Sequence, residues 1–171
     1  SGAAWLLEQN HNLILPRPLQ QAFSLLVQKE AERGEKELSQ MAVWNLFRQA
    51  YGIVDAPPLR LKEYVCNNQS DQRTVLSAEL ICQGKKLSLT GEGNGFLSAA
   101  LTALCREWKT ELEIVSYQEH TLGKRSDSRS VAYVCCQDRT GRCAWGVSID
   151  SDITRASLQA MLNAAADFIT C

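Results

Sequence analysis

The sequence predicts an α+β fold in which a β-β-β-α unit occurs twice, forming a two-layer domain behind a small helical subdomain. Each of two amphipathic helices follows three segments in which apolar residues alternate with the two-residue period of a strand. Residues 1–52, by contrast, show helical spacing only. Aligning Ala99-Ala100-Leu101 with Ala156-Ser157-Leu158 gives an offset of 57 residues between the two units. We therefore expect a helical subdomain at residues 1–56 and a second domain at 57–171, with repeats 59–109 and 111–169.

The N-terminal subdomain is expected to contain three helices and a linker. Proline is favoured at the first turn of a helix, serine at the N-cap, and glycine just after the last turn. The linker is marked by the run Ala56-Pro57-Pro58. On these signals the helices cover Ala3–Gln9, a run that begins near Pro18 and ends at Gly34, and a run capped by Ser39 and stopped by Gly52.

The first repeat is expected to place three strands before a helix. Period-two alternation and the tight turn Gln83-Gly84-Lys85 predict strands at Leu59–Cys66, Thr74–Cys82 and Lys86–Gly91. The helix follows because apolar residues recur at i, i+3, i+4, i+7, i+8 and i+11. They are Leu97, Ala100, Leu101, Leu104, Cys105 and Trp108.

The second repeat follows the same order. Its strands are expected at Leu112–Glu119, Ser130–Cys136 and Arg142–Ile149. Ser130–Cys136 is apolar on both faces, so we expect it deep in a sheet or at an interface. The last helix carries its apolar stripe on Leu158, Met161, Leu162, Ala165 and Ile169.

Composition excludes several classes of function. A net charge of −1 gives no reason to expect a nucleic acid or an anionic membrane as a partner, and no apolar run is long enough to span a bilayer. The seven cysteines are odd in number and include no C-x-x-C pair, which argues against a disulfide framework and a zinc site. With only two histidines, the chain also has few of the ligands that a Cys/His zinc site needs. We therefore expect reduced, mostly buried cysteines in a cytoplasmic protein.

Two loops that close a strand and open a helix are the candidate ligand sites. Gly91–Gly95 offers flexible backbone and free N–H groups at a helix N-terminus, which suit a carboxylate. At the equivalent place in the second repeat, Asp150-Ser151-Asp152 carries two acids that could meet an ammonium group. Together they suggest a zwitterion such as a free amino acid. The structural alternatives are a glycine turn with an Asn cap and two ordinary acidic caps.

His120, beside Glu119, is a possible acid-base pair. No Ser or Cys nucleophile motif accompanies it, and a histidine held at a strand end by a hydrogen bond is the favoured interpretation. The tryptophans do not cluster in the sequence, and packing is the default role for each.

Three phrases in order resemble the C-terminal regulatory, leucine-sensing domain of 2-isopropylmalate synthase. They are Gly93-Asn94-Gly95 before a helix, Tyr117-Gln118-Glu119-His120-Thr121-Leu122 after a strand, and Gly146–Leu158 into the last helix. The segment Leu15–Ser24 resembles the linker that joins that domain to the catalytic barrel in the longer form of the enzyme. The resemblance covers nearly all of residues 2–166.

The resemblance implies a homodimer that binds leucine or a related amino acid near the dimer interface. The positions that match the family's effector-binding residues are Gly93, Asn94, Gly95, Leu97, Ser98, Tyr117, Thr121, Asp127 and Ile149. Phe96, Thr121 and Ser148 depart from the family pattern by adding bulk or polarity. These departures are expected to lower leucine affinity or to change the effector.

The resemblance also implies what this chain lacks. The family's divalent metal is held in the barrel by an H-x-H pair and an aspartate, and only His11 and His120 occur here. We therefore expect no cofactor and no catalysis of the condensation of acetyl-CoA with 2-oxoisovalerate. Residues 1–52 normally lie between the barrel and the regulatory domain, so we expect them to pack loosely, or differently from their setting in the whole enzyme, and we expect protease cleavage near residues 52–58. The start within a helical pattern suggests an excised fragment.

Three alternatives stay open. The same module in citramalate synthase would sense isoleucine, a stand-alone amino-acid-binding module would have no enzyme attached, and a thiol or metal enzyme would use the cysteines. The linker segment Leu15–Ser24 favours 2-isopropylmalate synthase over citramalate synthase.

Overall fold

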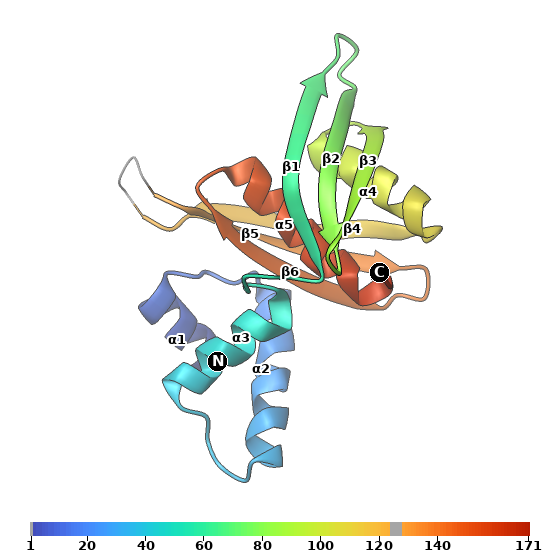
Figure 1. Ribbon diagram of the computed structural model, residues 1–171. Coiled ribbons are helices and arrows are strands. Elements are labelled where there is room, and N and C mark those ends of the chain that lie inside the picture. Colours follow the sequence, from blue (N-terminus) through green and yellow to red (C-terminus); the bar gives the residue numbers. More distant parts are fainter. Residues whose placement is uncertain (1, 124–127) are drawn as a thin grey trace.

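The structure is a computed structural model that describes residues 2–123 and 128–171 (Figure 1). Its order is three helices, two β-β-β-α units and a final 3-10 turn, which confirms the predicted fold class. The helices are α1 (Gly2–His11), α2 (Arg17–Arg33), α3 (Gln40–Tyr51), α4 (Phe96–Trp108) and α5 (Ile153–Ala165), followed by η1 (Ala166–Phe168). The strands are β1 (Leu59–Asn68), β2 (Thr74–Cys82), β3 (Lys85–Gly93), β4 (Leu112–Thr121), β5 (Ser130–Asp138) and β6 (Cys143–Asp150).

The duplication is visible in the backbone of the described residues. Each unit forms an antiparallel three-stranded sheet, in the orders β1-β2-β3 and β4-β5-β6. Helices α4 and α5 are both 13 residues long, and their first residues Phe96 and Ile153 have the predicted offset. The first strand of each unit also carries a bulge at the same place, between Leu61 and Glu63 in β1 and between Ile114 and Ser116 in β4. The two units are therefore a structural repeat, with the predicted offset of 57 residues at the helices.

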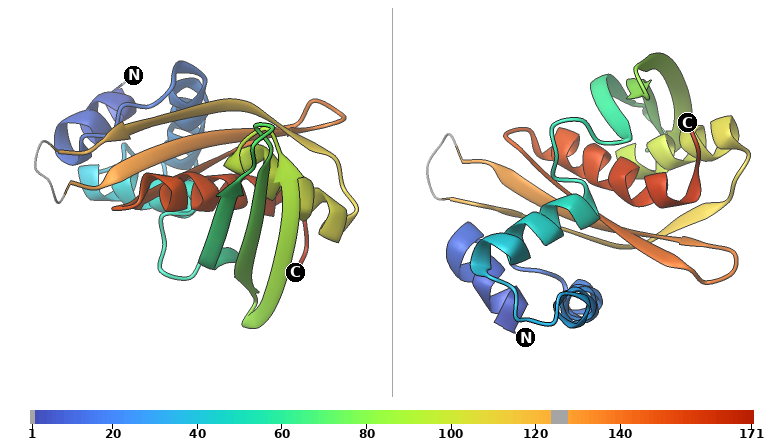
Figure 2. Two further views of the ribbon diagram at one scale, coloured as in Figure 1. Left: turned by 90° about the horizontal axis from the view of Figure 1, so that it is seen from above. Right: turned by 60° about the horizontal axis from the view of Figure 1, so that its bottom comes forward.

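Helix α5 lies between the two sheets and joins the repeats (Figure 2). It contacts β5 and β6 of its own sheet and β1 of the other. Its apolar residues are the centre of the main core, with Leu158 and Met161 almost fully buried. Three polar residues on another side of the helix, at spacing i, i+4 and i+8, bind the linker and β1 instead. They are Arg155, Gln159 and Asn163.

The polar residues of α5 satisfy the free edge of β1. The Gln159 side chain accepts a hydrogen bond from the Leu61 N–H at 2.8 Å and donates one to the Leu59 carbonyl at 2.8 Å. Arg155 donates to the carbonyls of Leu61 and Lys62, where the bulge turns them away from the ladder. The first repeat is thus joined to the helix of the second by hydrogen bonds from α5 side chains to the β1 backbone as well as by apolar packing.

Strand β5 is buried on both faces, as its sequence predicts. Ala132, Val134 and Cys136 pack into the core around α5, whereas Val131 and Tyr133 pack against the helical subdomain. That second cluster also contains Leu7, Leu13, Leu15, Leu19, Phe23, Val43, Phe47, Tyr51 and Val147. The helical subdomain therefore shares a core with the second sheet, and the expectation of loose packing for residues 1–52 is wrong.

Element boundaries follow the predicted signals closely. The Ser39 hydroxyl accepts from the Ala42 N–H at 3.1 Å, and Gly52 ends α3 with φ of +96°. Strand β2 has the predicted limits and alternation. Helix α5 stops at Ala165, so Ile169 lies beyond it, packed against the core from an extended segment.

The expectation of reduced cysteines is wrong for one pair, and the expectation of mostly buried cysteines is wrong because only three of the seven are buried. Cys82, at the end of β2, and Cys171, at the chain end, form a disulfide across 89 residues of sequence. The 3-10 turn after α5 brings the last residues back beside the linker and the first sheet, a proximity that spacing alone does not reveal. Among the other cysteines, Cys135 and Cys136 are buried and Cys143 is exposed.

Thiol titration of the chain in denaturant, without reductant, is expected to find the five free thiols that remain beside the Cys82–Cys171 pair. Cleaving a bond that closes so long a loop should lower the free energy of unfolding by about 2–4 kcal/mol. Cys171→Ser should have the same effect as reductant. Seven reactive thiols, or no effect of reductant on unfolding, would show that the pair is not bonded in solution.

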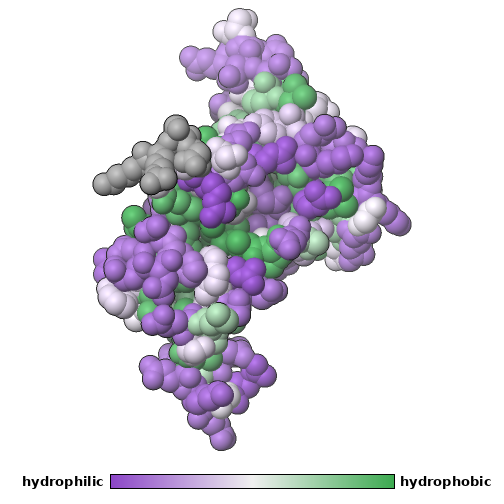
Figure 3. Space-filling view, turned by 60° about the vertical axis from the view of Figure 1, so that its left-hand side comes forward, coloured by the Kyte–Doolittle hydropathy of each residue, from purple (hydrophilic) through white to green (hydrophobic). Residues whose placement is uncertain are grey.

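The surface of the described residues gives one further feature. Figure 3 shows hydrophobic surface gathered at mid-height of one face, below the grey segment. Large apolar side chains that are exposed in the structure include Trp5, Ile14, Val115 and Tyr117. None of the described helices has the length and apolar character needed to cross a bilayer.

Candidate functional site

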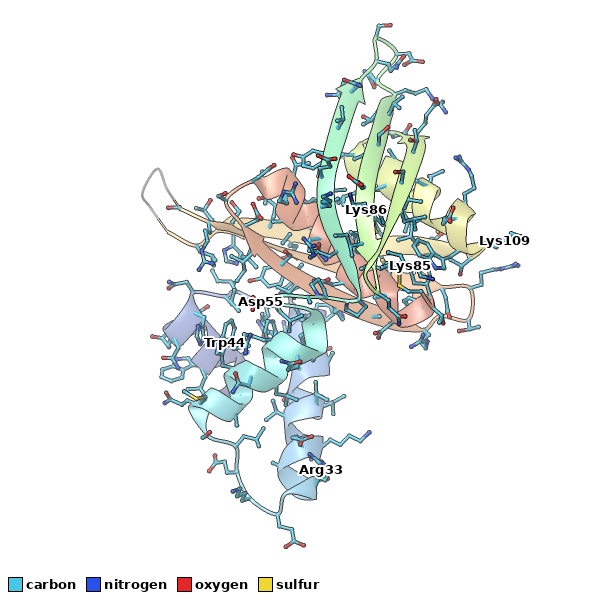
Figure 4. All side chains as sticks on the ribbon, viewed as in Figure 1. Arg33, Trp44, Asp55, Lys85, Lys86 and Lys109 are labelled. Atoms are coloured by element: carbon cyan, nitrogen blue, oxygen red, sulfur yellow. A yellow bond between two sulfur atoms is a disulfide. The ribbon has the colours of Figure 1, made fainter. Side chains whose placement is uncertain are left out.

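An open cleft of about 1260 Å³ lies between α4 and the second sheet. The first turn of α4 contributes Leu97 and Ser98, and β4 contributes Tyr117. The segment after Lys109, labelled in Figure 4, forms one end of the cleft. The other lining residues are Leu101, Thr102, Cys105, Thr110, Glu111, Leu112, Glu113, Ile114, Gln137, Asp138, Arg139 and Gly141. Three of the predicted effector-binding residues thus share one cleft.

The mouth of the first repeat is built so that the backbone is accessible. Gly93 ends β3, and a side chain there would meet the Ser98 hydroxyl at 2.5 Å and the Ala99 nitrogen at 2.6 Å. Gly95 is the N-cap of α4 in an extended conformation, with no side chain to cap the first turn. Its carbonyl accepts from the Ala99 N–H at 2.9 Å. The N–H groups of residues 96–98 therefore have no capping side chain at Gly95, a geometry suited to an anion.

Asn94 is exposed beside these glycines and makes no cap hydrogen bond, because Gly95 occupies the N-cap position. The alternative of an Asn-capped glycine turn therefore does not hold. The polar side chain of Asn94 is left facing solvent at the mouth.

The mouth of the second repeat is capped by its own acids. One Asp152 oxygen accepts from the N–H groups of Thr154 and Arg155, and the other accepts from the Tyr64 hydroxyl at 2.7 Å. Asp150 accepts from the Asp152 N–H at 2.9 Å. Both carboxylates are engaged within the chain: Asp152 is confirmed as the N-cap of α5, whereas Asp150 binds the backbone of the loop before the helix. They give no support to an ammonium site at this mouth.

The hydrogen bond from the Tyr64 hydroxyl, with those from the two backbone N–H groups, lowers the pKa of Asp152. Asp152→Ala is expected to reduce the free energy of unfolding by about 1 kcal/mol near neutral pH, the usual worth of an N-cap. A lowered folded-state pKa places this stabilisation above the unfolded pKa of about 3.9, and it is lost as the pH falls through the folded pKa. Urea unfolding of the parent and the variant at about pH 7 and pH 2.5 tests this.

Asp150→Ala is the matched control for Asp152, because Asp150 accepts a single backbone hydrogen bond. Its loss at neutral pH should be smaller. A deficit for Asp152→Ala that is equal at both pH values would contradict a role for the charged cap.

Tyr117 ties the cleft to the second repeat. Its hydroxyl lies 2.7 Å from the Ser157 hydroxyl, which in turn donates to the Ile153 carbonyl at 2.8 Å. Ser157 is fully buried and its hydrogen is committed to Ile153, so Tyr117 is the donor in this pair. A ligand that moves Tyr117 would therefore act on the first turn of α5.

The remaining predicted residues lie elsewhere. Thr121 is exposed at the end of β4, outside the cleft lining, and Asp127 lies outside the described residues. Ile149 is on the opposite face of the sheet, packed against the helical subdomain. It lines a second cavity of about 310 Å³ beside Asp55, which Figure 4 labels in the linker. Within one chain, Ile149 and Tyr117 do not face a common space.

Sequence reasoning missed the apolar wall of the cleft. Leu97, Leu101 and Cys105 recur every four residues along one side of α4, and of these the sequence analysis assigned only Leu97 to the effector site. Ile114 and Leu112 of β4 complete the wall. The available signal was the width of the stripe, since α4 is apolar on more of its circumference than one sheet can cover.

Among the described residues, no group of three or more His, Cys, Asp or Glu side chains is placed to hold a metal ion.

The known proteins to which this chain is similar share one name. The chain is 40% identical over 166 residues to a 2-isopropylmalate synthase of Marinomonas sp. (strain MWYL1), covering 96% of this chain and 30% of that protein. It is 34% identical over 164 residues to the 2-isopropylmalate synthase of Corynebacterium glutamicum (strain R), covering 95% and 26%. The enzyme of the same name from Thermobifida fusca (strain YX) is 34% identical over 166 residues, covering 95% and 28%.

The chain thus spans less than a third of the length of these relatives. The LeuA allosteric (dimerisation) domain family matches residues 37–169, which include both β-β-β-α units, the cleft and the third helix of the subdomain. The chain belongs to the LeuA allosteric (dimerisation) domain family.

Proposed function

We propose that this chain is the regulatory part of a cytoplasmic 2-isopropylmalate synthase, that it dimerises, and that it binds leucine in the cleft between α4 and β4. The observation that carries the proposal is that Leu97 and Ser98, in the uncapped first turn of α4, border the same cleft as its apolar walls. The N–H groups after Gly95 suit the carboxylate, and Leu97, Leu101 and Ile114 suit a branched apolar side chain.

The second mouth does not compete for the carboxylate. Asp152 already accepts from the N–H groups of Thr154 and Arg155, so α5 offers no equivalent uncapped terminus. This asymmetry supports one effector site per chain, at the first mouth. The ammonium group would face the polar part of the cleft, where Glu111, Glu113 and Asp138 line the wall.

A second copy of the chain would complete the site. β4 is an edge strand of its sheet, and its Val115 and Tyr117 side chains are 47% and 39% exposed. A family defined by dimerisation supports a partner on such a surface. A partner could also supply the positions, such as Ile149, that lie away from the cleft of one chain. Light scattering should find a dimer at micromolar concentration, and a monomer there would contradict this part of the proposal.

Calorimetric titration of the chain with leucine, isoleucine and alanine tests the effector. Leucine is expected to bind most tightly and alanine least, because the apolar wall contacts the side chain. At a concentration 100 times its dissociation constant, leucine should also stabilise the chain by about 2.7 kcal/mol. Preference for isoleucine would favour the citramalate synthase alternative, although the relatives named above are 2-isopropylmalate synthases. No binding of any of the three would reject the proposed effector class.

The catalytic barrel, its divalent metal and the condensation of acetyl-CoA with 2-oxoisovalerate belong to the proposed parent enzyme, since this chain spans under a third of its relatives. Leucine would inhibit that enzyme by binding one state of the dimer better than the other. The helical subdomain, which packs against the second sheet, is the part of this chain through which such a difference would reach the barrel.

A further inference from the structure

A hydrogen-bonded chain of three residues, centred on the buried Tyr133, joins β4 to the helical subdomain. The Nε2 atom of His120 lies 2.8 Å from the hydroxyl oxygen of Tyr133 in β5. The backbone N–H of Ile14, between α1 and α2, donates to the same oxygen at 3.1 Å and lies 3.4 Å from Nε2. The Nδ1 atom of His120 lies 3.2 Å from the Thr121 carbonyl oxygen. His120 is thus held by hydrogen bonds, as the sequence analysis favoured.

One arrangement of protons satisfies all these contacts. The Ile14 N–H can only donate, so the Tyr133 oxygen accepts from it and directs its own hydrogen toward His120. The Thr121 carbonyl can only accept, so Nδ1 of His120 carries the ring hydrogen and Nε2 is the acceptor. The relay therefore runs in one direction, from Ile14 through Tyr133 and His120 to Thr121, and each hydrogen bond depends on its neighbours.

The N-terminal end of the relay is fixed by packing. Tyr133 is fully buried, and Leu13 and Leu15 on either side of Ile14 are 0% and 4% exposed. The Gln20 side chain donates to the Leu15 carbonyl at 2.9 Å, which holds the same segment to α2. A shift of Tyr133 or His120 is therefore transmitted to the connection between α1 and α2.

The other end of the relay lies in the strand that carries proposed effector contacts. The side chain of Tyr117 faces α5 and the cleft, whereas that of His120, opposite Val131 in the ladder, faces the helical subdomain. Thr121, another position that matches the family's effector residues, supplies the carbonyl that receives the last hydrogen bond. One strand thus presents effector contacts on one face and the relay on the other.

We propose that this relay passes effector occupancy from the end of β4 to the helical subdomain, with His120 and Tyr133 as positioning residues. The inference rests on the proposed function, because it needs an effector at the cleft. A ligand that moves β4 changes the placement of the Thr121 carbonyl, hence the ring of His120, the Tyr133 hydroxyl and the Ile14 N–H.

The test measures hydrogen exchange of the Ile14 amide by NMR, with and without leucine, in the parent chain and in Tyr133→Phe. Calorimetry first establishes leucine affinity in both. Leucine is expected to change Ile14 exchange in the parent. Tyr133→Phe keeps the ring but removes the acceptor, so Ile14 should exchange about fivefold faster without ligand. Its leucine affinity should stay within about threefold of the parent's while the leucine response at Ile14 is lost.

A second pair of variants separates coupling from packing. Gln in place of His120 can still accept from Tyr133 and donate to the Thr121 carbonyl, whereas Leu can do neither. His120→Gln should therefore retain most of the leucine response at Ile14, and His120→Leu should lose it. This pair also decides the matter if Tyr133→Phe fails to fold.

Three outcomes would count against the relay or its basis. Leucine binding with no change at Ile14 in the parent would overturn the relay alone. An undiminished response at Ile14 in Tyr133→Phe or His120→Leu would do the same. Absence of leucine binding to the parent, measured separately by calorimetry, would overturn the proposed function and the inference that rests on it.

Discussion

Gly95→Asp is expected to abolish leucine binding and leave the fold intact. Apart from its chain neighbours, no heavy atom of the described residues lies within 4 Å of a Cβ built on Gly95, and its φ of −173° is open to any residue, so the side chain fits. Aspartate is also a strong N-cap and would accept from the free N–H groups of α4, as Asp152 does for α5. The same carboxylate would fill the anion site and repel the carboxylate of the ligand.

The expected loss of leucine affinity is at least about 100-fold, since two like charges about 4 Å apart near a protein surface repel by about 4 kcal/mol and 1.4 kcal/mol is a tenfold change. Gly95→Ala is the matched control: it adds a Cβ without charge or capping ability and should bind leucine within about threefold of the parent. Calorimetry measures affinity and circular dichroism checks the fold. Unchanged affinity in Gly95→Asp would place the effector away from the first mouth.

Gly146→Val should have the largest effect on stability. Gly146 lies in β6 where α5 approaches most closely, and a Cβ there would collide with the backbone carbonyl of Ala160 and the backbone nitrogen of Ala164. Backbone atoms cannot rotate away as a side chain can, so α5 would have to move off its sheet. We expect a loss of about 3 kcal/mol or more in the free energy of unfolding, at the upper end of overpacking effects.

Gly91 makes a similar close approach in the first repeat, facing the Ala99 carbonyl and Ala103 of α4. Gly91→Val should therefore destabilise comparably, whereas Gly95→Ala, with open space around the new Cβ, should change stability by less than about 0.5 kcal/mol. Urea unfolding compares the three variants. A Gly146→Val chain as stable as the parent would mean that α5 does not lie so close to β6.

Most of the fold could be predicted from the sequence because its signals are local. The strand alternation in β2, the Ser39 cap and the Gly52 stop each depend on a few neighbouring residues. The offset that aligned the two helices also aligned their N-caps, Gly95 and Asp152. The apolar periodicity, the capping residues and the internal repeat all predict the same elements, and the structure contains them.

The site was harder to predict because it depends on geometry that a period does not record. The bulge between Ile114 and Ser116 places Ile114 and Tyr117, an odd number of residues apart, on the same face of β4. Simple alternation would put them on opposite faces. Without that bulge Tyr117 could not share the cleft wall with Ile114, and no pattern in the sequence predicts the bulge.

Contacts between distant segments were equally beyond the sequence. The Cys82–Cys171 pair, and the link from Ile14 to Tyr133 across 119 positions, both depend on how the helical subdomain and the chain end fold back. The resemblance identified which positions match the family's effector-binding residues, but not on which face of the sheet each side chain lies. Ile149 therefore matched the family pattern and still lies across the sheet from Tyr117.

The most direct test of the account is a leucine titration followed by backbone amide NMR of this chain. If leucine binds at the uncapped terminus of α4, the amides of Phe96, Leu97 and Ser98 should shift together and saturate with the calorimetric affinity, while those of Thr154 and Arg155, already bonded to Asp152, should not follow the same titration. Largest shifts at Thr154 and Arg155, or around Ile149 and the linker cavity, with residues 96–98 unmoved, would contradict it.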